Sequence, residues 1–159
     1  MNAFFLDQMA MYAGYHRDPR NRATHFVGVP AIAFALLVAM ARLQIGPLSL
    51  AVLFVAAVAA FYLWLDWRLG LPTVAANLPL LALAEWSADQ SAAVGWTLFL
   101  VCFVGGWAFQ LWGHAMEGRK PALLDNLLQA LIAPIFLVSE VAFSLGLRRE
   151  LRTAVEARA

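Results

Sequence analysis

Charged side chains are scarce in this chain. Asp, Glu, Lys and Arg make up 13% of its 159 residues, against roughly 25% in an average soluble domain. Hydrophobic residues reach 63% of the sequence. So few charges cannot cover the surface of a water-soluble domain of this size, so the composition indicates one integral membrane domain over residues 1–159. The formal net charge of +1 gives no indication of nucleic-acid binding.

The sequence contains a single cysteine and shows no recognisable secretion signal. The single cysteine, Cys102, lies inside an apolar run, which excludes an intrachain disulfide and favours a small buried hydrophobic side chain. Residues 1–24 contain no apolar stretch of the kind that a cleavable signal peptide requires. Membrane insertion is therefore expected to depend on internal segments.

Long apolar runs are abundant. A membrane-spanning helix needs about 20 apolar residues, with a range of about 17 to 25. The five apolar runs cover residues 26–41, 43–65, 69–84, 90–113 and 126–147. The second and fourth runs reach the required length and the first is slightly short. The third and fifth contain prolines, which predict a short, broken or kinked helix.

These runs predict the fold class. Because open sheet edges are not viable in lipid, we expect an all-α polytopic bundle with four to five membrane segments within residues 26–147. Residues 1–25 are expected to form a short interfacial helix followed by a polar loop, and residues 148–159 a basic tail. Gly46 and Pro47 predict the turn between the first two membrane segments.

Histidine is also rare, and its three copies lie at the ends of apolar runs. His16 and His25 precede or begin the first run, and His114 follows the fourth. Four crossings return the chain to its starting side, so all three are expected at one membrane face if the third run crosses. The arginines near these histidines make that face cytoplasmic by the positive-inside rule. A fifth full crossing would place the basic tail outside, so the last run is expected to be re-entrant or one run incomplete.

A polar stripe follows the fourth run. Gln110, His114 and Glu117 lie at positions i, i+4 and i+7, which share one face of a helix. An ionisable side chain at membrane depth is a candidate functional residue. Imidazole suits iron, zinc, copper and nickel, and a carboxylate favours iron or manganese. The histidines and Glu117 therefore form a candidate site for a transition metal.

Other interpretations stay open on the residues alone. Each histidine could be an amphipathic side chain at headgroup level, as we interpret Tyr12 and Tyr15. The chain could be a non-catalytic membrane transporter or scaffold whose polar stripe lines a substrate path. A zinc-dependent membrane hydrolase could use the same histidines.

Two segments resemble a known family. YHRDPRNRATHFVGVP (15–30) and QLWGHAMEGRKPALLDNLLQALIAPIF (110–136) are similar to the two signature blocks of the 2-hydroxy fatty acid dioxygenases. That family is named for the metabolism of phytosphingosine to odd-numbered fatty acids. The resemblance covers nearly the whole chain, and its second block is the more specific. It implies a membrane dioxygenase that depends on iron(II) and uses O₂ to cleave the C1–C2 bond of a 2-hydroxy fatty acid.

The resemblance also implies which residues form the site. His16, His25 and His114 would be the ligands of Fe(2+), and Glu117 would join them as a catalytic residue. Some members carry a His-His pair where this chain has His16 and Arg17. A fourth protein ligand would then be Glu117, or water would complete the shell.

Further roles concern the surroundings of the metal. Asn21, Gln110 and Asn126 would orient the imidazoles through hydrogen bonds. Arg17 or Arg20 would pair with the substrate carboxylate. The expected partners are a 2-hydroxy fatty acid, O₂ and membrane lipid. The compact loops and the lack of a eukaryotic retrieval tail favour a bacterial inner membrane, with the metal site at its cytoplasmic face.

Overall fold

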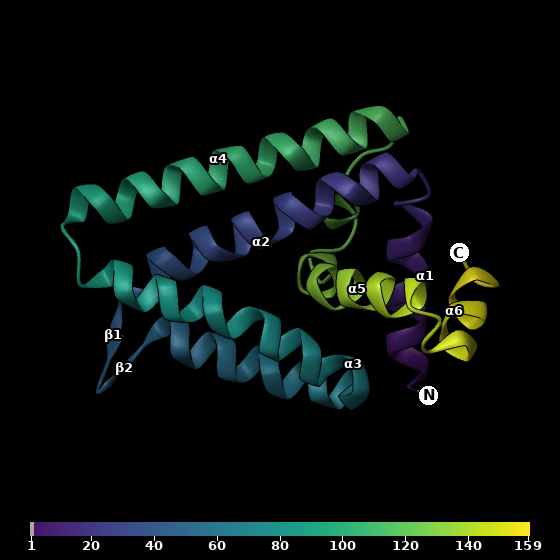
Figure 1. Ribbon diagram of the computed structural model, residues 1–159, viewed down its shortest axis with the longest axis horizontal. Helices are drawn as coiled ribbons and strands as arrows, with labels where there is room; N and C mark the ends of the chain where they lie inside the picture. Colours follow the sequence, from purple (N-terminus) through teal and green to yellow (C-terminus); the bar gives the residue numbers. More distant parts are fainter. Residues whose placement is uncertain (1) are drawn as a thin grey trace.

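The computed structural model describes residues 2–159 and is helical apart from one short β-hairpin (Figure 1). This confirms the predicted all-α class. In chain order the elements are α1 (Ala3–Gly14), α2 (Pro19–Ala41), β1 (Gln44–Ile45), β2 (Leu48–Ser49), α3 (Leu50–Ala88), α4 (Ala92–Glu117), the 3-10 helix η1 (Ala122–Leu124), α5 (Gln129–Ser144) and α6 (Arg149–Glu156).

Helix α3 consists of two antiparallel legs joined at Asp66. The backbone leaves helical geometry there, with φ −160° and ψ 104°, and the Asp66 carboxylate accepts hydrogen bonds from two N–H groups of the second leg. The Ser49 hydroxyl, just before the first leg, donates to Glu85 near the end of the second. The two ends of α3 therefore lie side by side (Figure 1).

The second leg of α3 corrects the prediction of a short or broken third segment. The helix continues through Pro72 and Pro79 as far as Ala88. Between the prolines, the Thr73 hydroxyl donates to the Leu69 carbonyl and the Asn77 amide to the Thr73 carbonyl, both at 2.7 Å. Such side-chain hydrogen bonds help an apolar helix to accommodate proline.

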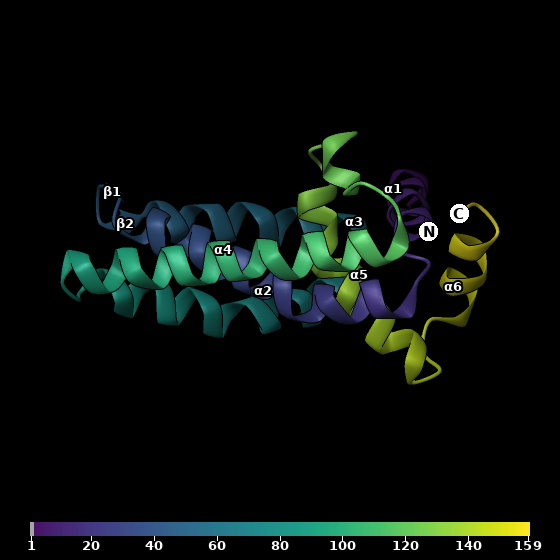
Figure 2. The same ribbon diagram turned by 90° about the horizontal axis from the view of Figure 1, so that it is seen from above.

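Four segments run along the long axis of the molecule (Figures 1 and 2). They are α2, the two legs of α3, and α4. Helices α2, α3 and α4 are each long and apolar enough to cross a membrane. At 1.5 Å per residue, α2 and α4 are about 35 and 39 Å long, which exceeds the hydrocarbon core of about 30 Å. The chain enters α2 and leaves α4 at the same end, as the count of crossings predicts.

The start of α2 differs from the prediction. The helix begins at Pro19, seven residues before the apolar run, because the Asp18 side chain accepts from the Arg20 N–H and proline occupies the first helical position. His25 therefore lies inside a helix. The second membrane helix begins at Leu50 and not at residue 43, because Gly46, with φ +63°, closes the β-hairpin before it.

The last apolar run forms a helix too short to cross a membrane by itself. Helix α5 has 16 residues, which corresponds to about 24 Å, less than the hydrocarbon core. The chain then bends by 117° into α6. Figure 2 shows α5 lying across the long axis, with α1 and α6 at the same end of the bundle. By its length, α5 alone is too short for a full span, which agrees with the expectation of a re-entrant or incomplete last segment.

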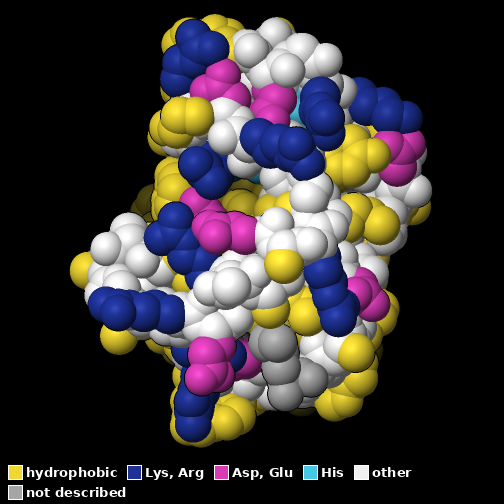
Figure 3. All heavy atoms as spheres, turned by 90° about the vertical axis from the view of Figure 1, so that its right-hand side faces the viewer, with side chains coloured by type: hydrophobic (Ala, Val, Ile, Leu, Met, Phe, Trp, Pro, Cys, Tyr) yellow, Lys and Arg dark blue, Asp and Glu magenta, His cyan; other side chains and the backbone are white. Residues whose placement is uncertain are grey.

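Charged and aromatic side chains lie at the ends of the helix bundle. Figure 3 looks onto the end that carries α1 and α6, where Lys, Arg, Asp and Glu side chains gather. Exposed tryptophans Trp64, Trp67 and Trp112 lie toward this end, and Trp86 and Trp96 toward the other. Two such belts are typical of the two membrane–water interfaces.

The core has two parts. One cluster lies where α1, α3, α5 and α6 meet, and its largest fully buried side chains include Phe5, Met9 and Phe136. A second cluster lies toward the opposite end of the bundle and consists of Leu37, Val38, Ala41, Ala51 and Ala84, which we call the distal cluster. Side chains of both clusters line the candidate site, namely Tyr12 and Tyr62 of the first cluster and Leu37 of the distal cluster.

Candidate metal centre

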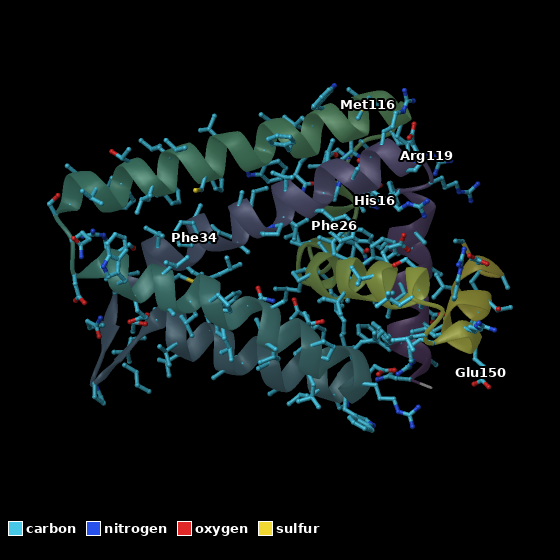
Figure 4. All side chains as sticks on the ribbon, viewed as in Figure 1. His16, Phe26, Phe34, Met116, Arg119 and Glu150 are labelled. Atoms are coloured by element: carbon cyan, nitrogen blue, oxygen red, sulfur yellow. The ribbon has the colours of Figure 1, made fainter. Side chains whose placement is uncertain are left out.

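Three histidines from distant parts of the chain meet at one end of the bundle. His16 lies in the turn between α1 and α2, His25 on α2 and His114 on α4, and their exposed fractions are 2%, 2% and 4%. One nitrogen of each ring lies within 4.8 Å of those of the other two. Figure 4 shows His16 at the end of the bundle where α1 meets α2. The tertiary structure therefore brings together the three predicted metal ligands.

The turn between α1 and α2 explains how residues nine positions apart face each other. On one continuous helix, His16 and His25 would point in different directions. The chain instead leaves α1 after Gly14 and restarts at the Asp18 cap, so His16 folds back against α2. The Nε2 atoms of His16 and His25 are 3.0 Å apart.

The hydrogen bonds of these two rings fix their tautomers. His16 Nδ1 is 2.7 Å from the Tyr12 carbonyl oxygen, and His25 Nδ1 is 2.8 Å from the Asn21 carbonyl oxygen. A carbonyl oxygen only accepts, so each neutral ring carries its proton on Nδ1 and leaves a lone pair on Nε2. Burial lowers the pKa of His16 from 6.5 to about 3, so this ring is neutral at pH 7.

Two facing lone pairs at 3.0 Å repel each other unless a cation lies between or beside them. Bonds from imidazole nitrogen to a metal of about 2.0–2.1 Å bring neighbouring ligand nitrogens to about this separation. His114 also indicates a bound cation, because its buried Nδ1 has no hydrogen-bond partner within the described chain. The three imidazoles therefore fit a transition-metal ion, and neutral imidazole suits iron, zinc, copper and nickel.

Glu117 does not join this group. Its carboxylate accepts hydrogen bonds from the N–H groups of Arg17 at 2.7 Å and Asp18 at 3.2 Å, and from Asn21 Nδ2 at 2.8 Å. These donors form the N-terminus of α2, where a negative charge is favourable. The cluster of candidate ligands contains only the histidines. Glu117 lies on the same face of α4 as His114 but about one turn further along the helix. Its carboxylate therefore contacts the start of α2 and joins the two helices.

Asn21 lies beside the histidines, as predicted, but it acts on them through its backbone. Its carbonyl accepts the His25 ring proton, while its side chain binds Glu117. Tyr12 was interpreted as an interfacial residue, and that interpretation is wrong. Tyr12 is buried, and its ring stacks on His16 with centroids 4.0 Å apart. Its carbonyl orients His16 at the same time, which only the fold of the α1–α2 turn decides.

The predicted roles of Gln110 and Asn126 separate in the structure. Gln110 is buried on α4 and lines the cavity beside His114. Asn126 orients no imidazole: its amide donates to Gln8 Oε1 at 3.2 Å, and its oxygen accepts from the Leu128 N–H. The loop after α4 turns the chain toward α1 and so carries Asn126 away from the histidines.

Arg17 and Arg20 also lie outside the site. Both side chains are exposed, and neither lines the cavity described below. Arg17 donates to the Ala159 carbonyl, and Arg20 forms an ion pair with Asp18 at 2.8 Å. The structure therefore does not bring Arg17 or Arg20 to the cavity, and their pairing with a substrate carboxylate stays a prediction.

Glycines that the sequence reasoning missed allow α2 and α4 to approach. A Cβ on Gly113 would lie 2.1 Å from Thr24 Oγ1 and 2.4 Å from Asn21 Oδ1. A Cβ on Gly28 would lie 2.9 Å from the Gly106 carbonyl oxygen. Small residues permit close packing of membrane helices, and here they bring His25 and His114 together. The seven-residue spacing of Gly106 and Gly113 puts both on one face of the helix and could have predicted this close helix contact.

An apolar cavity with a volume of about 190 Å³ leads away from the histidines. It is lined by α2, both legs of α3, α4, α5 and the segment 121–123. Its polar lining side chains, beyond the histidines, are those of Tyr12, Tyr62, Asn77, Gln110 and Gln129. The remaining lining is hydrophobic, so the cavity suits a largely apolar molecule with one polar end.

The fold and site define an integral membrane protein in which a buried triad of histidines, able to hold a metal, adjoins an apolar cavity. A family model described as "2-hydroxy-palmitic acid dioxygenase Mpo1-like" matches residues 3–145. The chain belongs to this family, which confirms the resemblance seen in its two signature segments.

One relative shows how far the similarity extends. The chain is 34% identical over 152 residues to the 2-hydroxy-palmitic acid dioxygenase MPO1 of Saccharomyces cerevisiae. The match covers 94% of this chain and 86% of the yeast protein. No solved structure matches the chain.

Proposed function

We propose that this protein is an iron(II)-dependent dioxygenase that uses O₂ to cleave the C1–C2 bond of a 2-hydroxy fatty acid, leaving an acid one carbon shorter. The observation that carries the proposal is the 3.0 Å approach of the Nε2 atoms of His16 and His25, with His114 beside them and an apolar cavity next to them. The name of the yeast relative supports this choice of substrate and reaction class.

The residues of the chain prepare the metal site. Three imidazole ligands leave positions on a six-coordinate metal for both O₂ and a substrate. Iron, when bound, supplies the one-electron chemistry that O₂ requires. The Tyr12 and Asn21 carbonyls hold the His16 and His25 rings with Nε2 free. Such outer partners fix ring orientation and raise ligand basicity.

The cavity orients the substrate. A 2-hydroxy acid has a polar carboxylate and hydroxyl at one end, and these would lie at the histidine end beside Gln110. Among residues 2–159, the cavity lining contains no Lys or Arg. The substrate charge would therefore be balanced at the metal and not by Arg17 or Arg20. The alkyl chain would lie along the apolar walls and keep water from the reacting end.

A transport function receives less support from the structure. A path across the membrane would need polar side chains beyond the cavity, but the distal cluster of Leu37, Val38, Ala41, Ala51 and Ala84 fills the bundle there. A zinc-dependent hydrolase would use the same three histidines, so metal analysis must separate it from the dioxygenase. The cytoplasmic orientation stays a prediction from the charge distribution, and the bacterial inner membrane stays a prediction from the compact loops and the lack of a retrieval tail.

The test is metal content combined with oxygen uptake. Protein purified anaerobically in detergent is expected to bind one iron(II) per chain and to consume O₂ when a 2-hydroxy fatty acid is added. His25→Ala should lose both properties. The matched control is Phe26→Ala, which truncates the exposed neighbour on the same helix and should retain both. Bound zinc without oxygen uptake would favour the hydrolase, and normal uptake by His25→Ala would refute the proposed site.

A further inference from the structure

The cavity extends from the histidines toward the middle of the bundle. One wall is a face of α2 on which lining residues recur every three or four positions, from Val29 to Leu37. The opposite wall is the first leg of α3, from Tyr62 at the histidine end back to Phe54. Both walls follow helix axes that run along the bundle (Figure 1). The cavity is therefore elongated in the direction of an extended alkyl chain.

Packed side chains of the distal cluster lie at the far end of the cavity. Phe54 and Val55 line the cavity and also pack against the distal cluster. Leu37 belongs to both the cavity wall and that cluster. The side chains beyond this point are apolar, so the end of a bound chain would meet a hydrophobic stop.

Helix geometry gives the length between the metal ligands and this stop. Leu36 follows His25 by 11 residues on α2, which corresponds to about 16 Å at 1.5 Å per residue. Carbon–carbon bonds of about 1.5 Å at tetrahedral angles advance an extended chain by about 1.25 Å per carbon. This length corresponds to about 13 carbons of an extended chain, in addition to the two carbons at the reacting end.

We infer that the distal end formed by Leu37 and Phe54 sets the upper limit on chain length, so that the enzyme prefers straight-chain 2-hydroxy acids of about 15 carbons. This inference rests on the proposed function. Phe54 and Leu37 act as specificity-determining residues, since a longer chain would have to displace the distal cluster. Shorter chains fit but leave apolar wall uncovered, which lowers their affinity.

The test is a substitution that shortens the cavity by placing a larger side chain on its wall. Ala59 lies on the cavity wall five residues nearer the histidine end than Phe54, a distance of about 7.5 Å. Ala59→Phe should therefore lower the longest accepted acid by about 6 carbons. The matched control is Ala60→Phe, the same substitution at the exposed neighbouring position. Phe54→Ala should move the preference toward longer chains.

Two readouts are measured for acids of 8 to 20 carbons. One is oxygen uptake, and the other is anaerobic binding of the same acids to the detergent-purified protein. Bound iron and turnover of the 8-carbon acid show that Ala59→Phe is folded. If it is not, Phe54→Ala and the Ala33→Phe change on the opposite wall test the same point.

The outcomes separate this inference from the proposed function. A shift of the chain-length profile in Ala59→Phe but not in Ala60→Phe supports it. Turnover with an unchanged profile in all wall variants overturns the inference and leaves the proposed function intact. If the binding profile shifts in Ala59→Phe but neither the wild type nor any variant takes up oxygen, the proposed function is overturned and the inference about chain length is retained. Absence of both binding and uptake in the wild type overturns both.

Discussion

Replacing Glu117 by glutamine tests whether this carboxylate positions the metal site or ligates the metal. The carboxylate accepts three hydrogen bonds, from the N–H groups of Arg17 and Asp18 and from the Asn21 amide, at 2.7 to 3.2 Å. Hydrogen bonds to a charged group contribute about 1.5–3 kcal/mol each. The two backbone donors lie near solvent and can bind water instead, so we expect a total loss of about 2–3 kcal/mol in Glu117→Gln.

The consequence for the metal follows from where those donors lie. Arg17 and Asp18 follow His16 directly, and Asn21 holds the His25 ring. Loosening this segment widens the range of positions of two ligands while leaving all three present. Changes to groups that orient metal ligands typically lower affinity by about 10–100-fold. We therefore expect this loss in Glu117→Gln, and a far greater loss in His25→Ala.

The assay is anaerobic competition for iron(II) between the protein and a chelator, together with the absorption spectrum of the cobalt(II)-substituted protein. Glu85→Gln is the matched control, since Glu85 is a hydrogen-bonded carboxylate at the opposite end of the bundle. A positioning role predicts weaker binding with an unchanged cobalt spectrum. A changed spectrum, with a loss of affinity as large as that of His25→Ala, would show that Glu117 is a ligand and refute the reasoning.

Two further predictions concern packing and pH. Gly113→Ala places a Cβ against Thr24 and Asn21 and should destabilise the protein by about 1–3 kcal/mol in detergent unfolding, whereas Gly105→Ala, whose Cβ meets open space, should not. An unchanged melting temperature in Gly113→Ala would contradict this view of the α2–α4 contact. The pKa of His16 falls from 6.5 to about 3 on burial, so below pH 6.5 the unfolded chain binds more protons than the folded one. The metal-free protein should lose stability as pH falls from 6.5 toward 3, and His16→Ala should reduce this dependence in thermal unfolding between pH 8 and pH 4.

Several features were predictable from the sequence because they depend on local or summed properties. The low content of charge excludes a water-exposed surface, and the lengths of the apolar runs decide which segments can cross. The parity of those crossings then placed His114 on the same side as His16 and His25. The start of α2 was also readable, from the Asp18 cap and Pro19, but the charged residues that follow obscured it.

Contacts between helices were not predictable in the same way. The spacing of Glu117 from His114 correctly placed both near one helix face, yet only packing decided that Glu117 meets the N-terminus of α2. The direction of the loop after α4 carried Asn126 to Gln8. Such partners depend on how closely two helices approach and where their axes cross, and sequence spacing specifies neither.

By itself, the sequence determined that this protein is an all-α membrane bundle with its three histidines at one end. The tertiary structure decided that the rings face one another, that Tyr12 and Asn21 orient them, and that an apolar cavity of limited length begins there. The reason is physical. Hydrophobicity and helix length act along one dimension of the chain, whereas a metal site and a cavity depend on interatomic distances across helices that only close packing sets.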